Sequence, residues 1–341
     1  MIHLLICPHR LDYGGSQLGI HHWARHLDRS RFTVSVLAMA RGGLSEKFEA
    51  SYPVFYDGVD YPNIEEYIRR LRPDIVHCAP GGGSDHEYIR KAAALATVTQ
   101  TVMCPRQAGN LNDVRGTAVL SGFVLSLQKR KENIIRIDLP FDAGEYDARY
   151  GRAHFGLPEG KLIICSIGNA RKENAHFMRI ARRYENPGAH FVIRSERSYN
   201  YLFGRKRVTV LKRRLTEDEK MSLMRLSDIF LYPTSNESYG MVFLEAMANR
   251  LPIITYDDAA NREVVGSGGL LARLNDIQGM AAHLDRLVKD RALRAELGQK
   301  GHELMVRRND PRAIARKYEE FFLNALQAGK ARKGPGFETC P

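Results

Sequence analysis

The sequence is most informative at Leu231-Tyr232-Pro233-Thr234-Ser235-Asn236-Glu237-Ser238-Tyr239-Gly240-Met241-Val242-Phe243-Leu244-Glu245-Ala246-Met247-Ala248. An apolar run typical of buried parallel strands ends at Pro233, and a polar turn follows it. An apolar helical segment then begins near Tyr239 or Gly240. A strand, a turn and a helix in this order are the repeating unit of an α/β fold with a parallel sheet.

Ligands bind to such sheets at the carboxyl ends of the strands, so this turn is where chemistry is expected. Glu237 lies in the turn. The free backbone amides of Gly240, Met241 and Val242 point the same way and form the positive end of a helix dipole, which suits a phosphate. Gly240 also lets a ligand approach the backbone closely. Glu245, about one and a half turns along the helix, can reach a neutral polyol such as a ribose.

The rest of the chain repeats this pattern, with short apolar runs alternating with segments of helical period. In the first half the expected strands are Ile2–Cys7, Phe32–Met39, Asp74–Ala79, Thr99–Cys104, Phe123–Leu127 and Ile134–Ile137, with helices at Gln17–Leu27 and Ile64–Leu71. In the second half they are Leu162–Ile167, His190–Arg194, Val208–Leu211, Asp228–Tyr232 and Pro252–Tyr256, with helices at Asn174–Tyr184 and Glu219–Leu226. A capping box, Thr216 with Glu219, marks the start of the last of these helices.

The segment Phe141–Glu159 lacks strong periodicity and contains Gly, Asp and Pro, so a domain junction is expected there. We therefore expect two doubly wound Rossmann-like domains, at residues 1–143 and 144–311, with a ligand cleft between the carboxyl ends of their sheets. Asp310 and Pro311 are suited to the N-cap and first turn of a final helix, 312–327. The tail 328–341 is expected to be disordered.

The net charge of +12 is concentrated in one segment, since residues 171–214 contain thirteen Lys and Arg against three Glu. Such a segment is either a solvated face or a surface for phosphates, as found in anionic ligands, anionic membranes or nucleic acids. Charge alone does not choose among these. No nucleic-acid-binding motif accompanies the charge, so nucleic acid is not the expected partner.

Composition and cysteine usage favour a protein of a reducing compartment. The chain of 341 residues is 44% hydrophobic and 26% charged, as in globular proteins that build sizeable cores. Its first residues read as a strand and not as a signal peptide, and no apolar run approaches the roughly 20 residues that span a bilayer. The five cysteines are scattered and never form a C-x-x-C pair. We expect a cytoplasmic protein, with peripheral contact at the inner membrane face as an option for the basic segment.

The stretch quoted first resembles the signature of the family 4 retaining glycosyltransferases of the GT-B fold, P-S-x-x-E-x-F-G-x-x-x-x-E-A-x-A-x-G-x-P. The matching positions are Pro233, Thr234, Glu237, Tyr239, Gly240, Glu245, Ala246, Ala248 and Pro252, while Arg250 stands where the family usually has Gly. The resemblance implies that Glu237 contacts the transferred sugar beside the reacting carbon and is the catalytic residue. It implies that Glu245 binds the ribose of the nucleotide. It also implies that the final helix packs back on the first domain.

The same resemblance suggests further contacts to the donor. The family has cations in the loop after the first strand of the second domain, where this chain reads Gly168-Asn169-Ala170-Arg171-Lys172. Arg171 and Lys172 are therefore assigned to the diphosphate, although Asn169 replaces the expected Arg. Gly14 and Gly15 match a Gly-Gly loop near the donor phosphates, and Tyr239 to Val242 complete the donor site.

Two further positions depart from the family pattern. Arg194 replaces a frequent glycine and offers an extra phosphate contact. The family also has a His where this chain reads Val102-Met103-Cys104-Pro105-Arg106-Gln107, which leaves the identity of the sugar open. The nearby His77 is interpreted as a satisfied residue at a strand end.

These observations favour a glycosyltransferase that moves a sugar, of hexosyl type, from a nucleoside diphosphate sugar to a glycan, lipid-linked or small-molecule acceptor. No cofactor other than the donor is expected, and the lack of an Asp-x-Asp motif at a strand end predicts no metal. The alternatives are a nucleotide-sugar epimerase of the same fold and, with less support, a basic nucleic-acid-binding protein. A phosphorylase would need a pyridoxal-binding lysine, for which no context is found.

Overall fold

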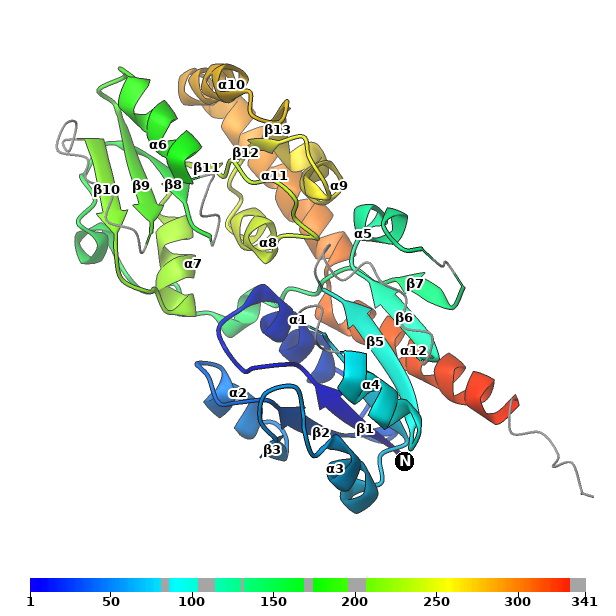
Figure 1. Ribbon diagram of the computed structural model, residues 1–341. Helices are drawn as coiled ribbons and strands as arrows, with labels where there is room; N and C mark the ends of the chain where they lie inside the picture. The colour runs from blue at the N-terminus through cyan, green and yellow to red at the C-terminus, as the bar shows by residue number, and fades with distance from the viewer. Residues whose placement is uncertain (81–85, 104–113, 130–131, 169–173, 196–206, 332–341) are drawn as a thin grey trace, which may run out of the picture. The chain divides into compact units, whose positions relative to one another are not determined.

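A computed structural model of the chain describes residues 1–80, 86–103, 114–129, 132–168, 174–195 and 207–331. The chain forms two compact units (Figure 1). The first unit consists of Met1–Pro140 and Asn309–Pro341, and the second of Phe141–Arg308. The first and last segments of the chain therefore belong to the same unit.

The first unit is built on a parallel sheet of seven strands in the order β3-β2-β1-β4-β5-β6-β7. The strands are β1 (Ile2–Cys7), β2 (Phe32–Ala38), β3 (Val54–Tyr56), β4 (Ile75–Cys78), β5 (Thr97–Val102), β6 (Gly116–Val119) and β7 (Ile134–Arg136). The helices are α1 (Gly15–Ala24), α2 (Ser45–Glu49), α3 (Ile64–Leu71), α4 (His86–Ala93), α5 (Gly122–Ser126) and α12 (Pro311–Ala331).

The second unit repeats this arrangement with a parallel sheet in the order β10-β9-β8-β11-β12-β13. Its strands are β8 (Leu162–Ser166), β9 (Ala189–Arg194), β10 (Val208–Leu211), β11 (Ile229–Leu231), β12 (Ile253–Tyr256) and β13 (Gly269–Ala272). Its α-helices are α6 (Asn174–Arg183), α7 (Glu217–Arg225), α8 (Met241–Ala248), α9 (Asn261–Val265), α10 (Ile277–Lys289) and α11 (Arg291–Arg308). Short 3₁₀ turns are η2 (Ala143–Glu145), η3 (Arg152–Phe155) and η5 (Gly266–Gly268). Two doubly wound sheets, as expected from the sequence, are confirmed.

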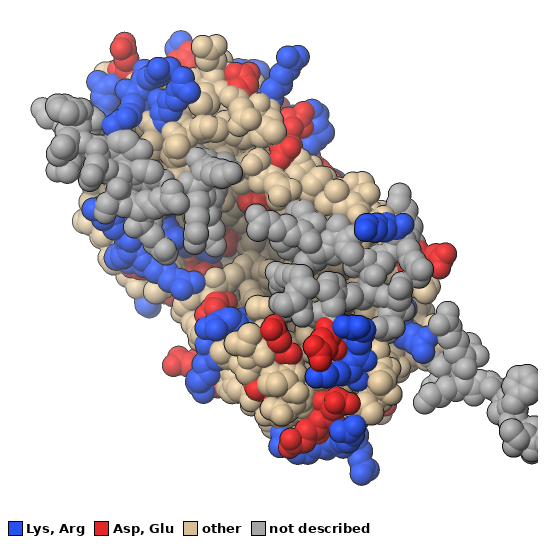
Figure 2. All heavy atoms as spheres, viewed as in Figure 1, with Lys and Arg blue, Asp and Glu red and all other residues tan. Residues whose placement is uncertain are grey.

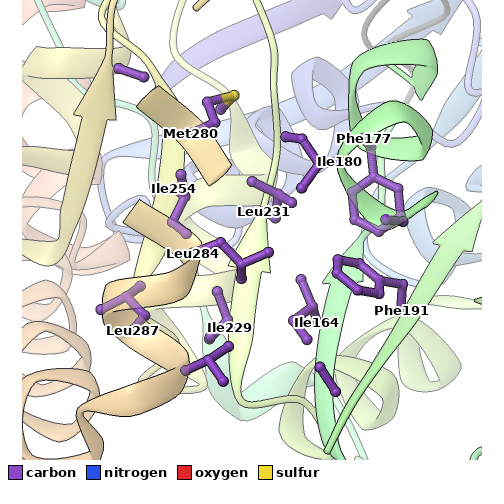
Figure 3. Packing of buried hydrophobic residues seen from close by; sticks show 14 of the residues in the cluster. Ile164, Phe177, Ile180, Phe191, Ile229, Leu231, Ile254, Met280, Leu284 and Leu287 are labelled. Carbon is purple, nitrogen blue, oxygen red and sulfur yellow. The ribbon is translucent and has the colours of Figure 1, made fainter. Parts of the chain in front are cut away.

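Helices α6 and α10 cover one face of the second sheet. Figure 3 shows their apolar side chains converging on the strands, with Phe177 and Ile180 from α6, Met280, Leu284 and Leu287 from α10, and Ile164, Phe191, Ile229, Leu231 and Ile254 from the sheet. Burial of each such side chain contributes about 1.5–3 kcal/mol. Helices α7 and α8 contact each other, and their buried residues lie outside this cluster. The loop after β11 starts from a strand whose side chains Ile229 and Leu231 are buried in this cluster.

The predicted strand Phe123–Leu127 is wrong, because this segment contains α5. The Ser121 side chain caps the helix by accepting a hydrogen bond from the Val124 amide at 3.2 Å. A short apolar run cannot be distinguished from a buried helical turn by periodicity alone. The strand that occupies this part of the sheet is β6, whose Gly116 and Thr117 gave no strong strand signal.

Both helix starts that were predicted from capping residues are confirmed. Thr216 and Glu219 form the capping box of α7, with both reciprocal hydrogen bonds present. The Asp310 carboxylate accepts a hydrogen bond from the Ala313 amide at 2.7 Å at the start of α12. Helix α12 continues to Ala331, beyond the expected end at residue 327. The remainder of the expected disordered tail, 332–341, lies outside the described residues.

Helix α12 is attached to the first unit by an aromatic cluster. Tyr318 stacks on Trp23 of α1 with ring centroids 4.3 Å apart, and its hydroxyl lies 3.1 Å from the Thr101 hydroxyl of β5. Phe322 is fully buried and contacts the rings of Trp23 and His77. Such contacts explain why the last helix belongs to the unit that the chain left at Pro140.

We expect Phe322→Ala to lower the free energy of unfolding of the first unit by about 3–5 kcal/mol, because it leaves a cavity among aromatic rings. Trp23 is the only tryptophan of the chain and lies in this cluster, so its fluorescence during urea unfolding reports on this unit. Val59→Ala, at an exposed turn, is the control and should change stability by less than about 0.5 kcal/mol. Equal midpoints for the two variants would contradict this role of Phe322.

Candidate functional site

The candidate site lies where β8 and β11 run side by side in the second unit. Residues Ile164 and Cys165 of β8 pair with Ile229 and Phe230 of β11, although α6, β9, β10 and α7 intervene in the sequence. The sheet is extended from β8 in one direction and from β11 in the other, so this is its topological switch point. Crevices for ligands form at the carboxyl ends of strands at such points.

The two strand ends are in close contact. A Cβ atom at Gly168, just after β8, would lie 2.3 Å from the Tyr232 hydroxyl, just after β11. Only glycine therefore fits at position 168 without displacing Tyr232. Residues Arg171 and Lys172, predicted to bind the diphosphate, follow in this loop but lie outside the described residues.

The loop after β11 holds Glu237 by specific contacts. The Thr234 hydroxyl donates to Glu237 Oε1 at 3.0 Å. The Glu237 carbonyl accepts from the Ala260 amide at 3.3 Å, and the Asn236 amide donates to Asp258 Oδ2 at 2.6 Å. Glu237 is half-buried, at the carboxyl end of the strand as the sequence predicted. Its side chain is thus oriented by the Thr234 hydroxyl, three residues earlier in the chain, and is still partly exposed to solvent.

Gly240 turns the chain from this loop into α8. It adopts φ 84° and ψ 81°, a conformation that side chains disfavour, and no side chain caps the helix. The amides of Met241 and Val242 therefore lie in a first helical turn without side-chain capping, as an anion site requires. Tyr239, also predicted to contact the donor, has only 1% of its surface exposed, so its ring packs inside the unit.

Glu245 of α8 is buried and ion-paired. Only 4% of its side chain is exposed, and its Oε1 lies 2.7 Å from Lys220 Nζ of α7. The same Nζ lies 2.6 Å from Glu217 Oε2, one helical turn earlier. Burial alone would lower the pKa of Lys220, but Glu245 and Glu217 outweigh it and raise the pKa to about 12. The ammonium is thus a permanent charge between two carboxylates.

The sequence analysis did not single out Lys220. The i,i+3 pairing of Glu217 with Lys220 was readable from the sequence as a helical ion pair. The contact with Glu245 was not, because it joins two helices that are separated by β11.

Tyr146 belongs to the same surroundings. Burial raises the pKa of its hydroxyl strongly, and Glu217, Glu245, Asp142 and Asp218 raise it further. Tyr146 comes directly after η2, and its ring stacks on Phe141 with centroids 5.7 Å apart. Four carboxylates near one hydroxyl make this an acidic region in which Lys220 is a compensating cation.

Gly14 and Gly15 lie in the first unit, at the carboxyl end of β1. Gly14 is the N-cap of α1, and a Cβ atom there would lie 2.6 Å from Gln17 Oε1. Ser16 lies within the first turn, because the helix begins at Gly15 and Gly14 adopts the extended conformation of an N-cap. The glycines thus form an uncapped helix start.

The remaining predicted positions have ordinary structural roles or lie outside the described residues. His77 is fully buried and its two ring nitrogens bind the hydroxyls of Thr99 and Thr101 at 2.9 and 3.0 Å, as a satisfied strand residue does. Burial lowers its pKa to about 3. Arg194 ends β9 and is half-buried. Arg106 lies in the undescribed segment 104–113.

The described residues show neither a cluster suited to a metal ion nor a helix suited to crossing a membrane. They contain no group of three or more His, Cys, Asp or Glu side chains arranged to hold a metal ion. Among the described helices there is none whose length and apolar character would let it cross a bilayer.

Part of the second unit matches a known protein family. Residues 151–304 match the family described as Glycosyl transferases group 1, and this segment contains Glu237, Lys220 and Glu245. A relative is N-acetyl-alpha-D-glucosaminyl L-malate synthase of Bacillus anthracis, 30% identical over 119 residues, which are 34% of this chain and 31% of that protein. The chain spans about a third of the length of the curated relatives it matches.

Solved structures extend the likeness over almost the whole chain. Anabaena Alr3699/HepE, solved in complex with UDP and glucose, superposes with a TM-score of 0.78 and 16% identity, covering 95% of this chain and 100% of that one. A putative UDP-N-acetylglucosamine 2-epimerase from Listeria monocytogenes gives a TM-score of 0.64 and 12% identity, covering 93% and 94%. At these identities the likeness shows the fold, which is the GT-B fold of paired Rossmann-like domains.

We expect Gly240→Ala to lower the free energy of unfolding of the second unit by about 1–3 kcal/mol. The new Cβ would be held at a positive φ and would lie 2.7 Å from a ring carbon of Phe243. Urea unfolding followed by circular dichroism measures the loss. Gly151→Ala is the matched control, since its φ is −93° and nothing lies within 4 Å of the new Cβ. If the two variants were equally stable, the constraint at Gly240 would be refuted.

Proposed function

We propose that this chain is a glycosyltransferase that takes a sugar from a nucleoside diphosphate sugar and passes it to a glycan, lipid-linked or small-molecule acceptor. One observation carries the proposal. Within the segment that matches Glycosyl transferases group 1, an uncapped helix start lies between two acidic side chains, Glu237 and Glu245, at the switch point of a Rossmann-like sheet. The relatives named as a synthase and the neighbour solved with UDP and glucose are consistent with this donor class.

The site offers a distinct partner for each part of such a donor. The amides of Met241 and Val242 and the helix dipole of α8 suit the diphosphate. A carboxylate such as Glu237 can orient sugar hydroxyls and stabilise positive charge at the reacting carbon. Glu245 can accept hydrogen bonds from ribose hydroxyls. Arg171 and Lys172, with Gly14 and Gly15, are proposed as further phosphate contacts on the basis of the family resemblance alone.

We further propose a retaining transfer of the family 4 type that needs no metal. In this step the bond from the sugar carbon to the diphosphate oxygen breaks, and a bond to the acceptor oxygen forms on the same face. The acceptor proton passes to the departing phosphate oxygen, so that charge and atoms balance. The support is the match of the motif around Glu237 to that family.

The proposed location is the cytoplasm, with a peripheral membrane contact as an option. The three described cysteines, Cys7, Cys78 and Cys165, are free thiols, as a reducing compartment would keep them. On the second unit Figure 2 shows Lys and Arg gathered near α6 and near β10. The exposed cations there include Arg179, Arg182, Arg183, Lys212, Arg213 and Arg214. Anionic lipid headgroups would be attracted to such a surface.

An epimerase is the second candidate, because a putative epimerase shares the fold. The two activities differ in their products. A transferase gives a nucleoside diphosphate and a glycosylated acceptor, whereas an epimerase changes the sugar and makes no acceptor product. Incubation with a panel of UDP-, GDP- and ADP-sugars, followed by chromatography of nucleotide and sugar products, separates them. Binding of none of these donors, together with salt-sensitive binding of DNA or RNA, would favour a nucleic-acid-binding protein.

We expect Glu237→Gln to reduce kcat for nucleotide release roughly 100-fold or more, with nucleoside diphosphate affinity little changed, because its charge is used at the reacting carbon. We expect Glu245→Ala to weaken nucleotide binding roughly 10- to 100-fold, the size of a hydrogen bond to a charged group. Glu159→Gln, with 85% of the side chain exposed, is the control. Steady-state kinetics and calorimetry that gave the opposite pattern would reverse the assigned roles.

We expect nucleotide release to continue at an unchanged rate in excess EDTA. Cationic side chains and helix amides would then neutralise the leaving diphosphate without a divalent ion. The rate is measured before and after chelation and after adding back Mg²⁺ or Mn²⁺. Loss of activity that the added ions restore would contradict the metal-independent part of the proposal.

A further inference from the structure

Lys220 is a half-buried cation that bridges two helices at the proposed donor site. Its Nζ lies 2.7 Å from Glu245 Oε1 on α8 and 2.6 Å from Glu217 Oε2 on its own helix α7. The exposed fractions of these three side chains are 17%, 4% and 18%. Such short contacts at low exposure fix the ammonium between the two carboxylates, whereas exposed ion pairs are loosely held.

This bridge places a cation against Glu245 in a region that is otherwise acidic. Glu217, Asp218 and Asp142 are close enough to act electrostatically on the same buried hydroxyl of Tyr146 as Glu245 does. Without a cation, the negative charge of Glu245 would face these carboxylates at low exposure, which is unfavourable. With so little of Glu245 exposed, its orientation decides whether an oxygen is presented to a ligand.

We propose that Lys220 is a positioning residue for the nucleotide ribose: it holds the ionised Glu245 carboxylate in the orientation that accepts hydrogen bonds from the ribose hydroxyls. The inference rests on the proposed function, because it assigns a task to the same donor site. Lys220 itself does not need to contact the donor. Its effect passes through Oε1 of Glu245.

The alternative is that Lys220 only joins α7 to α8. A second ion pair on α7 provides the comparison. Arg213, just before the helix, binds Glu219 through two nitrogens at 2.7 Å, and the Glu219 side chain is 8% exposed. This pair also contacts His154 but involves no residue of α8. Its loss would therefore disturb α7 while leaving the Lys220–Glu245 contact in place.

The experiment compares each nucleotide with its 2′-deoxy form. Calorimetry of the full-length protein measures the affinities of UDP, GDP and ADP beside those of dUDP, dGDP and dADP. The unchanged protein is expected to bind a ribonucleotide roughly 10- to 100-fold more tightly than its 2′-deoxy form. This is the effect that one or two hydrogen bonds to a charged group have on affinity. Lys220→Met should reduce this preference to less than about threefold, and Lys220→Arg should retain more of it than Lys220→Met because it keeps a positive charge near Glu245.

Two further variants keep the result interpretable. Lys220→Met alone leaves carboxylates without their cation and could fail to fold. The double variant Lys220→Met with Glu217→Gln removes one carboxylate together with the cation. In its folded form it should show the same loss of ribose preference. Arg213→Met is the matched control and should keep the ribose preference of the unchanged protein.

The outcomes separate this inference from the proposed function. A ribose preference that survives in folded Lys220→Met overturns the positioning role alone. A ribose preference that increases in Lys220→Met would show that Lys220 keeps Glu245 from the ribose, and this result also overturns the positioning role. If the unchanged protein binds none of the three nucleotides, the proposed function fails and this inference fails with it.

Discussion

Parallel pairing of β8 with β11 is the constraint on which the candidate site depends. The two strands are distant in sequence, yet their hydrogen bonds bring the turn at Gly168 and the loop of Glu237 to one edge of one sheet. The close fit of Gly168 against Tyr232 shows how tightly the two strand ends meet. The uncapped start of α8 follows from the same geometry, because the left-handed Gly240 leads directly from the loop into the helix. The Glu237 carboxylate and the α8 amides are therefore positioned by backbone pairing and not by the loop alone.

The sequence predicted the second unit better than the first. Strands such as Val208–Leu211 were predicted with their observed bounds, and the capping box at Thr216 located α7, because each depends on interactions within a few residues. The error at Phe123–Leu127 arose where an apolar run was too short to reveal its period. The strand β6 was missed since Gly116 and Thr117 give no such run. The conformation of β6 is decided by packing against its neighbouring strands.

At the site itself, sequence reasoning located the loop and the helix but not the state of their side chains. Glu245 was predicted to bind the ribose, but its burial and its pairing with Lys220 were not predicted. Nothing in the spacing of residues 220 and 245 predicts this contact, since it depends on how α7 and α8 pack. Tyr239 was similarly matched to a donor-binding position, but its ring is buried. Local patterns predict where backbone groups lie, and packing between helices decides which side chains a ligand can reach.

The return of α12 to the first unit gives the chain an insertional architecture. The second unit is bounded by two covalent connections, after Pro140 and before Asn309, and is in effect inserted into the first. A Rossmann-like half could be exchanged between relatives of this kind only by recombination at both boundaries. A single crossover would leave the first sheet without Tyr318 and Phe322 or supply them from a foreign helix. Changes in α12 are therefore expected to track those in Trp23 and in the strands that the helix covers.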